Sequence, residues 1–202
     1  MKNFKKGFTL VEMLIVVVII GILAAALLPR LLSAQASARD SARMSALQQI
    51  ATATAAYLQE KGDYPISGTN AKQWGTNDLL AKLIENGSVT SLPDEPQKNI
   101  QNEVIKDSNG KWKFTYAILK KNGIDDGAIV FAAKMERAGN ANYVYLSGTN
   151  GNQIGPNAQI GDSSKLFLCK KVTKGSSTQV ADADHQDCTY TEDSQLYYVG
   201  VY

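Results

Sequence analysis

The chain of 202 residues is long enough for one ordinary domain plus a membrane anchor and too short for two full domains. Its 21 basic and 19 acidic side chains give a formal net charge of +2, and 44% of its residues are hydrophobic. Three of the lysines precede the apolar N-terminal run, so the rest of the chain is nearly neutral and makes no general electrostatic case for binding nucleic acid.

The first element is an apolar run from Phe8 to Leu28, in which only Thr9 and Glu12 are polar. As a helix it would span about 30 Å, the thickness of a bilayer core. Residues 1–7 carry three lysines and no acid, so the positive-inside rule keeps them in the cytoplasm and sends the rest outward. Residues 8–28 are therefore predicted to form a transmembrane helix, in which Glu12 needs a partner because a carboxylate in hydrocarbon is costly.

Two ordinary explanations of this run remain open. A secretory signal peptide cut at the small residues near Ala36 or Ala38 would leave a soluble exported binding protein. The run is longer than a usual signal core, however, and a glutamate has no purpose there. An uncleaved signal anchor explains the length of the run but not Glu12.

The stretch KKGFTLVEMLIVVVIIGILAAALLP resembles the class III leader and first helix of type IV prepilins and pseudopilins. The resemblance is close over residues 1–65. It implies that a prepilin peptidase removes residues 1–7 by cutting after Gly7 and then methylates Phe8, which leaves Glu12 fifth in the mature chain. Pro29 lies where many members of the family have a helix-weakening proline.

The resemblance also gives Glu12 a partner. Cleavage leaves a positive amine on Phe8, which can meet the carboxylate of Glu12 in a neighbouring subunit of a filament. Removing one member of a buried ion pair costs on the order of 3–5 kcal/mol, so the pair would select one axial register among apolar helices that could otherwise slide. We expect Glu12 to act in assembly.

The helical pattern continues through residues 29–62. Apolar and small residues recur there at three- and four-residue spacing, which predicts an amphipathic half suited to covering a sheet. These residues are Met44, Leu47, Ala51, Thr54 and Leu58, with Ile50 and Tyr57 beside them. Gly62 is a natural C-cap. Gly21 and Pro29 weaken the helix between them, so stretching or local melting of a polymer is expected there.

Residues 63–202 are predicted to form a globular head. A short helix is expected around Asp78–Glu85, and prolines 93 and 96 indicate a rigid turn. Alternation with a period of two then predicts strands, with Trp112, Phe114, Tyr116 and Ile118 on one face of the first. The predicted strands are 111–119, 128–135, 142–146, 165–172 and 195–202, with a hairpin turn at 122–127, an exposed loop at 147–164 and the last strand possible at an edge.

The two cysteines, Cys169 and Cys188, are expected to form one disulfide if the head is exported to an oxidising compartment. The resemblance agrees, because pilins usually close a C-terminal loop in this way. Without the bond, the segment between the cysteines would be floppy. The expected fold is α+β and lollipop-like, one long N-terminal helix packed on an antiparallel sheet with a C-terminal disulfide loop.

Catalytic motifs are not found: the chain has no G-x-S-x-G, no Walker loop and no H-E-x-x-H sequence. The single histidine, His185, cannot build a usual zinc site alone. Asp182, Asp184 and Asp187 could hold calcium, as major pseudopilins do near their C-terminal loop, but the EF-hand pattern fails and a solvated acidic loop is the preferred interpretation. No cofactor is therefore expected and calcium stays an alternative.

Two surface features are less specific. Lys170, Lys171 and Lys174 could form a basic patch with Arg137 and Lys165, as DNA-uptake pili require, although such lysines are usually only solvated. Residues 86–88, Asn-Gly-Ser, match a glycosylation sequon that is too short to decide anything.

These observations predict a non-enzymatic subunit of a type IV pilus that forms a helical homopolymer through its N-terminal helix. The resemblance implies a platform protein and ATPases as partners, a cytoplasmic-membrane precursor and an extracellular filament used in adhesion, twitching motility or DNA uptake. The alternative is the major pseudopilin of a type II secretion or competence pseudopilus, because residues 92–96 (LPDEP) precede an aromatic strand. An enzyme would need an unrecognised site in the head.

Overall fold

The computed structural model describes residues 8–62, 72–73, 78–89, 95–96, 114–121, 124–145, 166–181, 186–192 and 194–202. The chain divides into two compact units, residues 1–38 and 39–202. Several predictions fall on residues outside the described ranges: Gly7, Pro93, Trp112, the loop 147–164, Lys165, Asp182, Asp184 and His185.

Helix α1 (Leu10–Lys61) runs without interruption through both Gly21 and Pro29. The prediction of a single long helix is confirmed, with its start two residues later than expected. Gly62 ends it as predicted: its φ is +73°, and its N–H donates to the carbonyl of Leu58 at 2.8 Å. A residue with a Cβ is strained in that conformation, whereas glycine adopts it freely.

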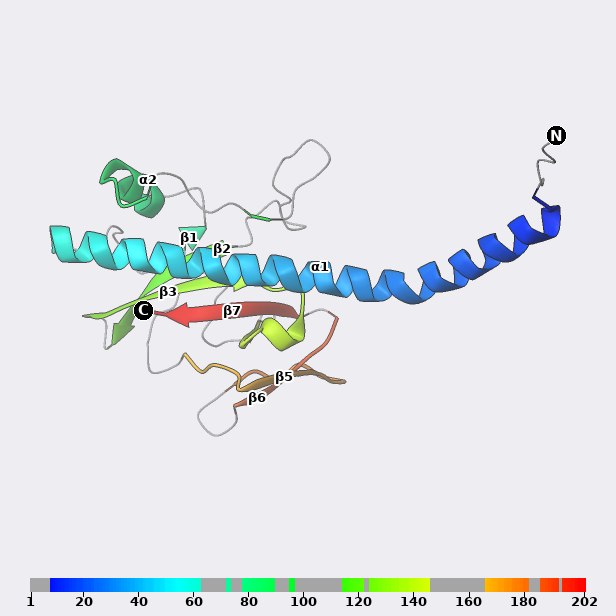
Figure 1. The fold of residues 1–202 in the computed structure, drawn as a ribbon. Helices are drawn as coiled ribbons and strands as arrows, with labels where there is room; N and C mark the ends of the chain where they lie inside the picture. Colours follow the sequence, from blue (N-terminus) through cyan, green and yellow to red (C-terminus); the bar gives the residue numbers. More distant parts are fainter. Residues whose placement is uncertain are drawn as a thin grey trace, which may run out of the picture. The chain divides into compact units, whose positions relative to one another are not determined.

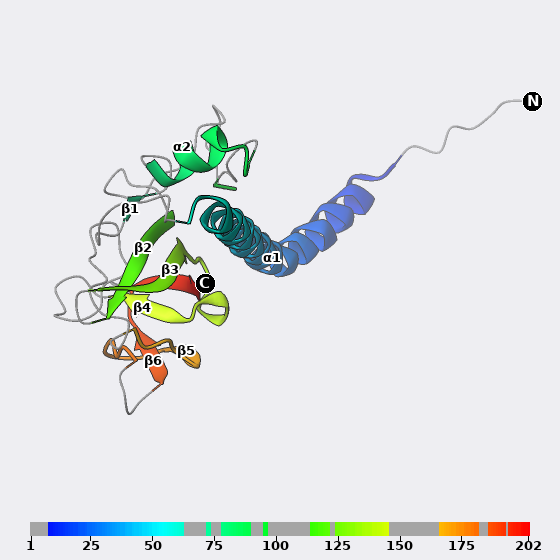
Figure 2. The ribbon, with the colours of Figure 1, turned by 90° about the vertical axis from the view of Figure 1, so that its left-hand side faces the viewer.

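The head contains a five-stranded antiparallel sheet in the order β1-β2-β3-β7-β4 (Figures 1 and 2). The strands are β1 (Lys72–Gln73), β2 (Phe114–Lys121), β3 (Ile124–Lys134), β4 (Tyr143–Tyr145) and β7 (Gln195–Val201). Helix α2 (Asp78–Glu85) has the predicted bounds, and its Leu83 is fully buried.

Two predictions about the sheet are wrong. Lys121 pairs with Ile124, so residues 124–127 begin β3 and are not part of the turn. The C-terminal strand is not at an edge, since Val199 pairs with Ala132 of β3 on one side and Leu196 pairs with Val144 of β4 on the other. The sequence of a strand shows which of its residues share one face of the sheet, but it does not show which strands lie beside it.

A second, two-stranded sheet pairs β5 (Lys171–Lys174) with β6 (Asp187–Tyr190) in parallel. The strand predicted at 165–172 is therefore wrong over 166–170, which lie outside any strand. Leu166 and Leu168 pack instead against one face of the large sheet, so their alternation reflects packing on that face and not strand pairing. The parallel pair was not predicted, and it orders part of a segment that was expected to be flexible without the disulfide.

The C-terminal part of α1 and β3 form the core of the head. Leu47 and Ile50 of α1 are fully buried in one cluster with Phe131 and Ala133 of β3. Val130 and Ala132 belong to a second cluster, as the alternation of a strand requires. The predicted stripe is largely confirmed, since Leu47, Ala51 and Thr54 are buried and Met44 is partly buried against the same cluster.

Candidate functional site

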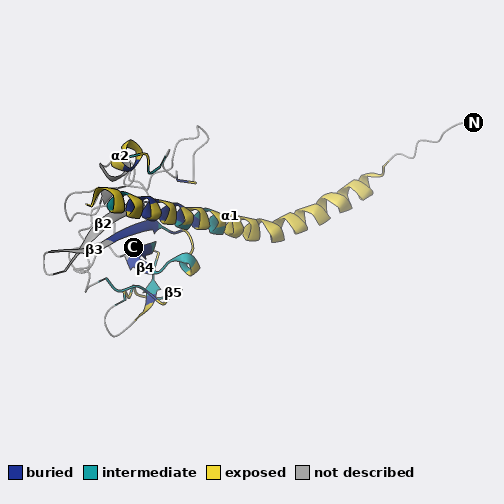
Figure 3. Cartoon of the chain, turned by 60° about the vertical axis from the view of Figure 1, so that its left-hand side comes forward, coloured by how far each residue is buried: buried dark blue, intermediate teal, exposed yellow. Residues whose placement is uncertain are grey.

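The first candidate site is the apolar surface of the N-terminal part of α1. Every residue from Phe8 to Gln35 is exposed, and the segment is yellow throughout in Figure 3. In the part of the chain that the structure describes, α1 is the one helix long and apolar enough to cross a membrane. An exposed apolar surface of this extent needs a lipid or protein partner in water. The apolar helix fits membrane anchoring.

Thr9 and Glu12 form a reciprocal cap at the start of α1. The N–H and the hydroxyl of Thr9 both donate to Oε2 of Glu12 at 2.8 Å, and the N–H of Glu12 donates to the hydroxyl of Thr9 at 3.2 Å. This is a capping box, which satisfies two donors that a helix N-terminus would otherwise leave open. Sequence reasoning missed it, although T-x-x-E before an apolar run is its signature.

The structure places the other predicted residues of this helix without testing their roles. Pro29 has no N–H to give to the carbonyl of Ala25, yet α1 stays helical there. A Cβ added at Gly21 would meet nothing within 4 Å, so packing does not require the glycine in this chain alone. Flexibility at these two positions remains a prediction about the assembled state.

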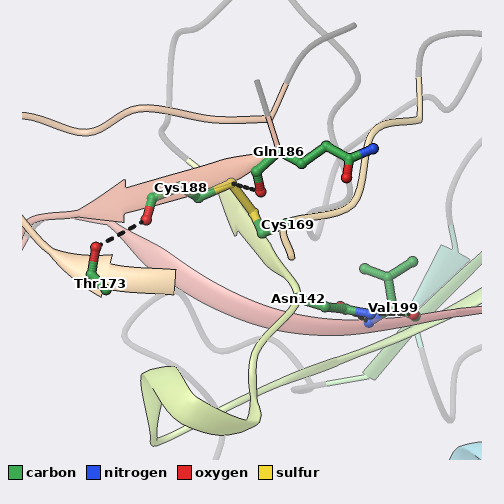
Figure 4. Close-up of a disulfide and its surroundings, with 6 residues drawn as sticks. All are labelled: Asn142, Cys169, Thr173, Gln186, Cys188 and Val199. Carbon is green, nitrogen blue, oxygen red and sulfur yellow. Dashed lines mark hydrogen bonds between the residues drawn. A yellow bond between two sulfur atoms is a disulfide. The ribbon is translucent and has the colours of Figure 1, made fainter. Parts of the chain in front are cut away.

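The predicted disulfide is present in the head. Cys169 and Cys188 are bonded, with their Cα atoms 5.7 Å apart, and both are buried (Figure 4). The N–H of Cys169 donates to the carbonyl of Asn142 at 2.7 Å, and the side chain of Asn142 bonds both backbone groups of Val199. The disulfide and these hydrogen bonds therefore connect the small β5–β6 sheet to Asn142, just before β4, and to Val199 of β7.

A buried ion cluster in the head was not anticipated. Arg43 is fully buried and its guanidinium lies between three carboxylates: Nη1 is 2.9 Å from Asp40, Nε is 3.0 Å from Glu95, and Nη2 is 2.8 Å from Glu136. Asp40 and Glu95 are also buried. We call Arg39, Asp40, Arg43, Glu95 and Glu136 the Arg43 cluster. An Asp and an Arg three residues apart usually form an exposed helix pair, so the sequence carried no signal of burial.

Backbone donors and a second arginine complete the cluster. Asp40 accepts hydrogen bonds from the N–H groups of Glu136 and Arg137 at 2.9 and 3.1 Å and from the amide of Asn140 at 3.1 Å. Hydrogen bonds from Arg39, helped by Arg43, lower the pKa of Glu136 to about 2 against the opposing effect of burial. Burial acts to lower the pKa of Arg43, but its carboxylates outweigh that effect and raise it. The cluster ties α1 to Glu95 and to the end of β3.

The remaining candidate residues do not form a site within the described parts of the chain. Asp187 is exposed, and no group of three potential metal ligands occurs among the described residues. Lys170 and Lys171 are exposed, and Lys174 pairs with Glu192 at 3.1 Å. In the sequon, the amide of Asn86 donates to Glu60 at 2.9 Å, which joins the end of α2 to the end of α1.

Comparison with known proteins identifies the N-terminal segment alone. Residues 2–28 match a family described as the prokaryotic N-terminal methylation motif. No curated protein and no solved structure matches the chain. The matched residues are those that carry the class III prepilin leader, in agreement with the resemblance to type IV pilins and pseudopilins. The motif implies processing by a prepilin peptidase.

Proposed function

We propose that this chain, which carries the prokaryotic N-terminal methylation motif at residues 2–28, is the structural subunit of a type IV pilus. The observation that carries the proposal is the continuous exposed apolar helix that follows the leader within the same motif. The precursor is held in the cytoplasmic membrane by this helix with its head outside. After cleavage between Gly7 and Phe8 and methylation of Phe8, it polymerises into an extracellular filament.

Apolar burial alone cannot drive the transfer from membrane to filament, because lipid tails are as apolar as the helix itself. Close packing and polar contacts must therefore specify the polymer. Glu12 is the candidate for this role. The Thr9 cap binds one oxygen of its carboxylate, and we propose that the amine released at Phe8 of a neighbouring subunit neutralises its charge.

The head supplies the outer surface of the filament in this proposal. Covalent and ionic contacts hold it together, among them the disulfide and the Arg43 cluster, so the head can stay folded when force acts on the helix. Assembly by a platform protein and ATPases accounts for extension. The filament's purpose, whether adhesion, twitching motility or DNA uptake, is set by head surfaces and partners.

The second candidate is the major pseudopilin of a type II secretion or competence pseudopilus. The observation that favours it is the burial of Glu95, which belongs to the sequence LPDEP ahead of strand β2 and binds Arg43 of the helix. Calcium binding by Asp182, Asp184 and Asp187 would belong to this alternative. A gene deletion that stops secretion but leaves surface filaments intact would favour the pseudopilus.

The decisive experiment is mass spectrometry of the N-terminal peptide of the chain from the envelope of its native host. We expect a peptide that begins at methylated Phe8. The control is the same chain in a host without prepilin peptidase, which should retain residues 1–7. A mature chain beginning near Ser37 or Arg39 would have lost Glu12 and the anchor, and would contradict the proposal.

A further inference from the structure

Glu12 and Arg30 are the only charged residues between Phe8 and Ala38, and they carry opposite charges. They are eighteen residues apart, which is about five full turns of an α-helix. Both lie within the continuous helix α1, so they occupy nearly the same face, about 27 Å apart along the axis. The two opposite charges therefore lie on one face of a mainly apolar helical segment, separated by a whole number of turns.

Both side chains have bonding capacity left in the single chain. The two hydrogen bonds from Thr9 reach only Oε2 of Glu12, which leaves Oε1 toward solvent. Arg30 is exposed and makes no hydrogen bond or ion pair with the parts of the chain that the structure describes. A guanidinium has five donors, and it suits a carboxylate better than an ammonium does.

We propose that Glu12 of one copy pairs with Arg30 of a second copy, so that two N-terminal helices pack in parallel with an axial offset of about 27 Å. The inference rests on the proposed function, and it adds a second cation, Arg30, to the amine at Phe8. The parallel arrangement follows from membrane topology, because the positive-inside rule inserts every copy with the same orientation.

The contact is head-to-tail and therefore does not close. Each copy offers a glutamate near the start of the apolar run and an arginine just beyond its end, so every pair leaves one partner of each sign for a further copy. A heterologous contact of this kind generates an open filament when the rotation does not close a ring. Among apolar helices, the charge pair also excludes intermediate offsets, which would place Glu12 against leucine and valine side chains.

The offset also matches the membrane. The run from Phe8 to Leu28 spans about 30 Å, so Arg30 lies just beyond the outer end of the hydrocarbon when the lysines of residues 1–7 are inside. A copy raised by about 27 Å brings its Glu12 to the level of Arg30 in a copy that is still in the membrane. The carboxylate of Glu12 then leaves the hydrocarbon at the level at which the guanidinium of Arg30 lies.

The test is a chemical cross-link in filaments of the full chain. Arg30→Lys keeps the charge and supplies an amine, and dicyclohexylcarbodiimide, which enters apolar regions, couples a carboxylate to a neighbouring amine as an amide. Filaments are first verified by pelleting and electron microscopy. We expect a peptide joining Glu12 of one chain to the introduced lysine of another. Glu12→Gln combined with Arg30→Lys is the control and should give no such peptide.

A matched set of variants tests the face of the helix. Arg30→Gln should lower filament yield on the order of tenfold, whereas Arg30→Lys should retain it. Combining Arg30→Leu with Leu31→Arg keeps the composition but rotates the charge by about 100°, and it should lower yield as Arg30→Gln does. Full yield from this relocated arginine would show that Arg30 only anchors the helix at lipid headgroups, and would overturn the pairing.

The outcomes separate this inference from the proposed function. If the unaltered chain forms no filaments, the proposed function fails and the pairing falls with it. If filaments form and Glu12 is joined only to the amine of Phe8, or to nothing, the function stands and the Arg30 pairing is overturned.

Discussion

Replacing Arg43 by methionine should strongly destabilise the head. Methionine can replace the aliphatic part of the arginine side chain but has no charge, so the substitution removes the cation and leaves the carboxylates of Asp40, Glu95 and Glu136 in place. Asp40 keeps two backbone N–H donors and Asn140, and Glu136 keeps Arg39. Glu95 is only 1% exposed and loses its three hydrogen bonds from the guanidinium, so its carboxylate becomes a buried charge without this cation.

Removing one partner from a buried ion pair costs about 3–5 kcal/mol. The whole stability of a domain is about 5–15 kcal/mol, so the change is a large fraction of it. Urea unfolding of the full chain in detergent, with the disulfide intact, measures the effect by tryptophan fluorescence. Arg137→Met is the matched control, because this arginine is exposed, and it should change stability by less than about 0.5 kcal/mol.

A double substitution distinguishes lost charge from lost packing. Arg43→Met combined with Glu95→Met removes the cation together with one of its two buried anions, and apolar replacement of a buried pair is often neutral or stabilising. The double variant should therefore be more stable than Arg43→Met alone. Its loss of stability should be smaller than the sum of the two single losses by about 1–3 kcal/mol, which is the coupling energy. A cost below about 1 kcal/mol for Arg43→Met, or simple additivity with Glu95→Met, would refute the reasoning.

Three further predictions concern the disulfide, the acid limit and assembly. Replacing Cys169 and Cys188 by serine opens a loop with a sequence separation of 19. The free energy of unfolding should fall by about 3 kcal/mol in the same urea assay. An unchanged urea midpoint would show that the β5–β6 sheet holds the segment without the disulfide. Arg39 and Arg43 lower the pKa of Glu136 from its usual 4.5 to about 2. The ionised Glu136 therefore contributes fully to the free energy of unfolding above about pH 5, and this contribution is lost as the pH falls toward 2. Glu136→Gln should therefore flatten stability against pH in that interval, and an unchanged slope would contradict it. Glu12→Ala should leave membrane insertion intact, as carbonate extraction would show, and should reduce the yield of filaments; a normal yield would remove Glu12 from the assembly mechanism.

Local features of the fold could be predicted because their causes lie within a few residues. The apolar run that starts α1, the glycine that ends it at Gly62 and the bounds of α2 all follow from composition and short-range spacing. The disulfide also followed, since two cysteines in an exported domain have only one way to pair. The capping box at Thr9 was available from the same local pattern and was overlooked.

Sheet order and charge burial could not be predicted, because they depend on residues far apart in the chain. Alternation in β7 shows which residues share a face, but only tertiary contacts place the strand between β3 and β4. The parallel pairing of β5 with β6 has the same non-local origin.

The sequence by itself determined the N-terminal element, an apolar run with one glutamate in contiguous residues that match a methylation motif. The leader and its cleavage point are predictions from the same residues. Only the tertiary structure decided that Arg43 is buried. Its neighbours Glu95 and Glu136 are 52 and 93 positions away in sequence, and an arginine can leave water only where such distant carboxylates converge on it.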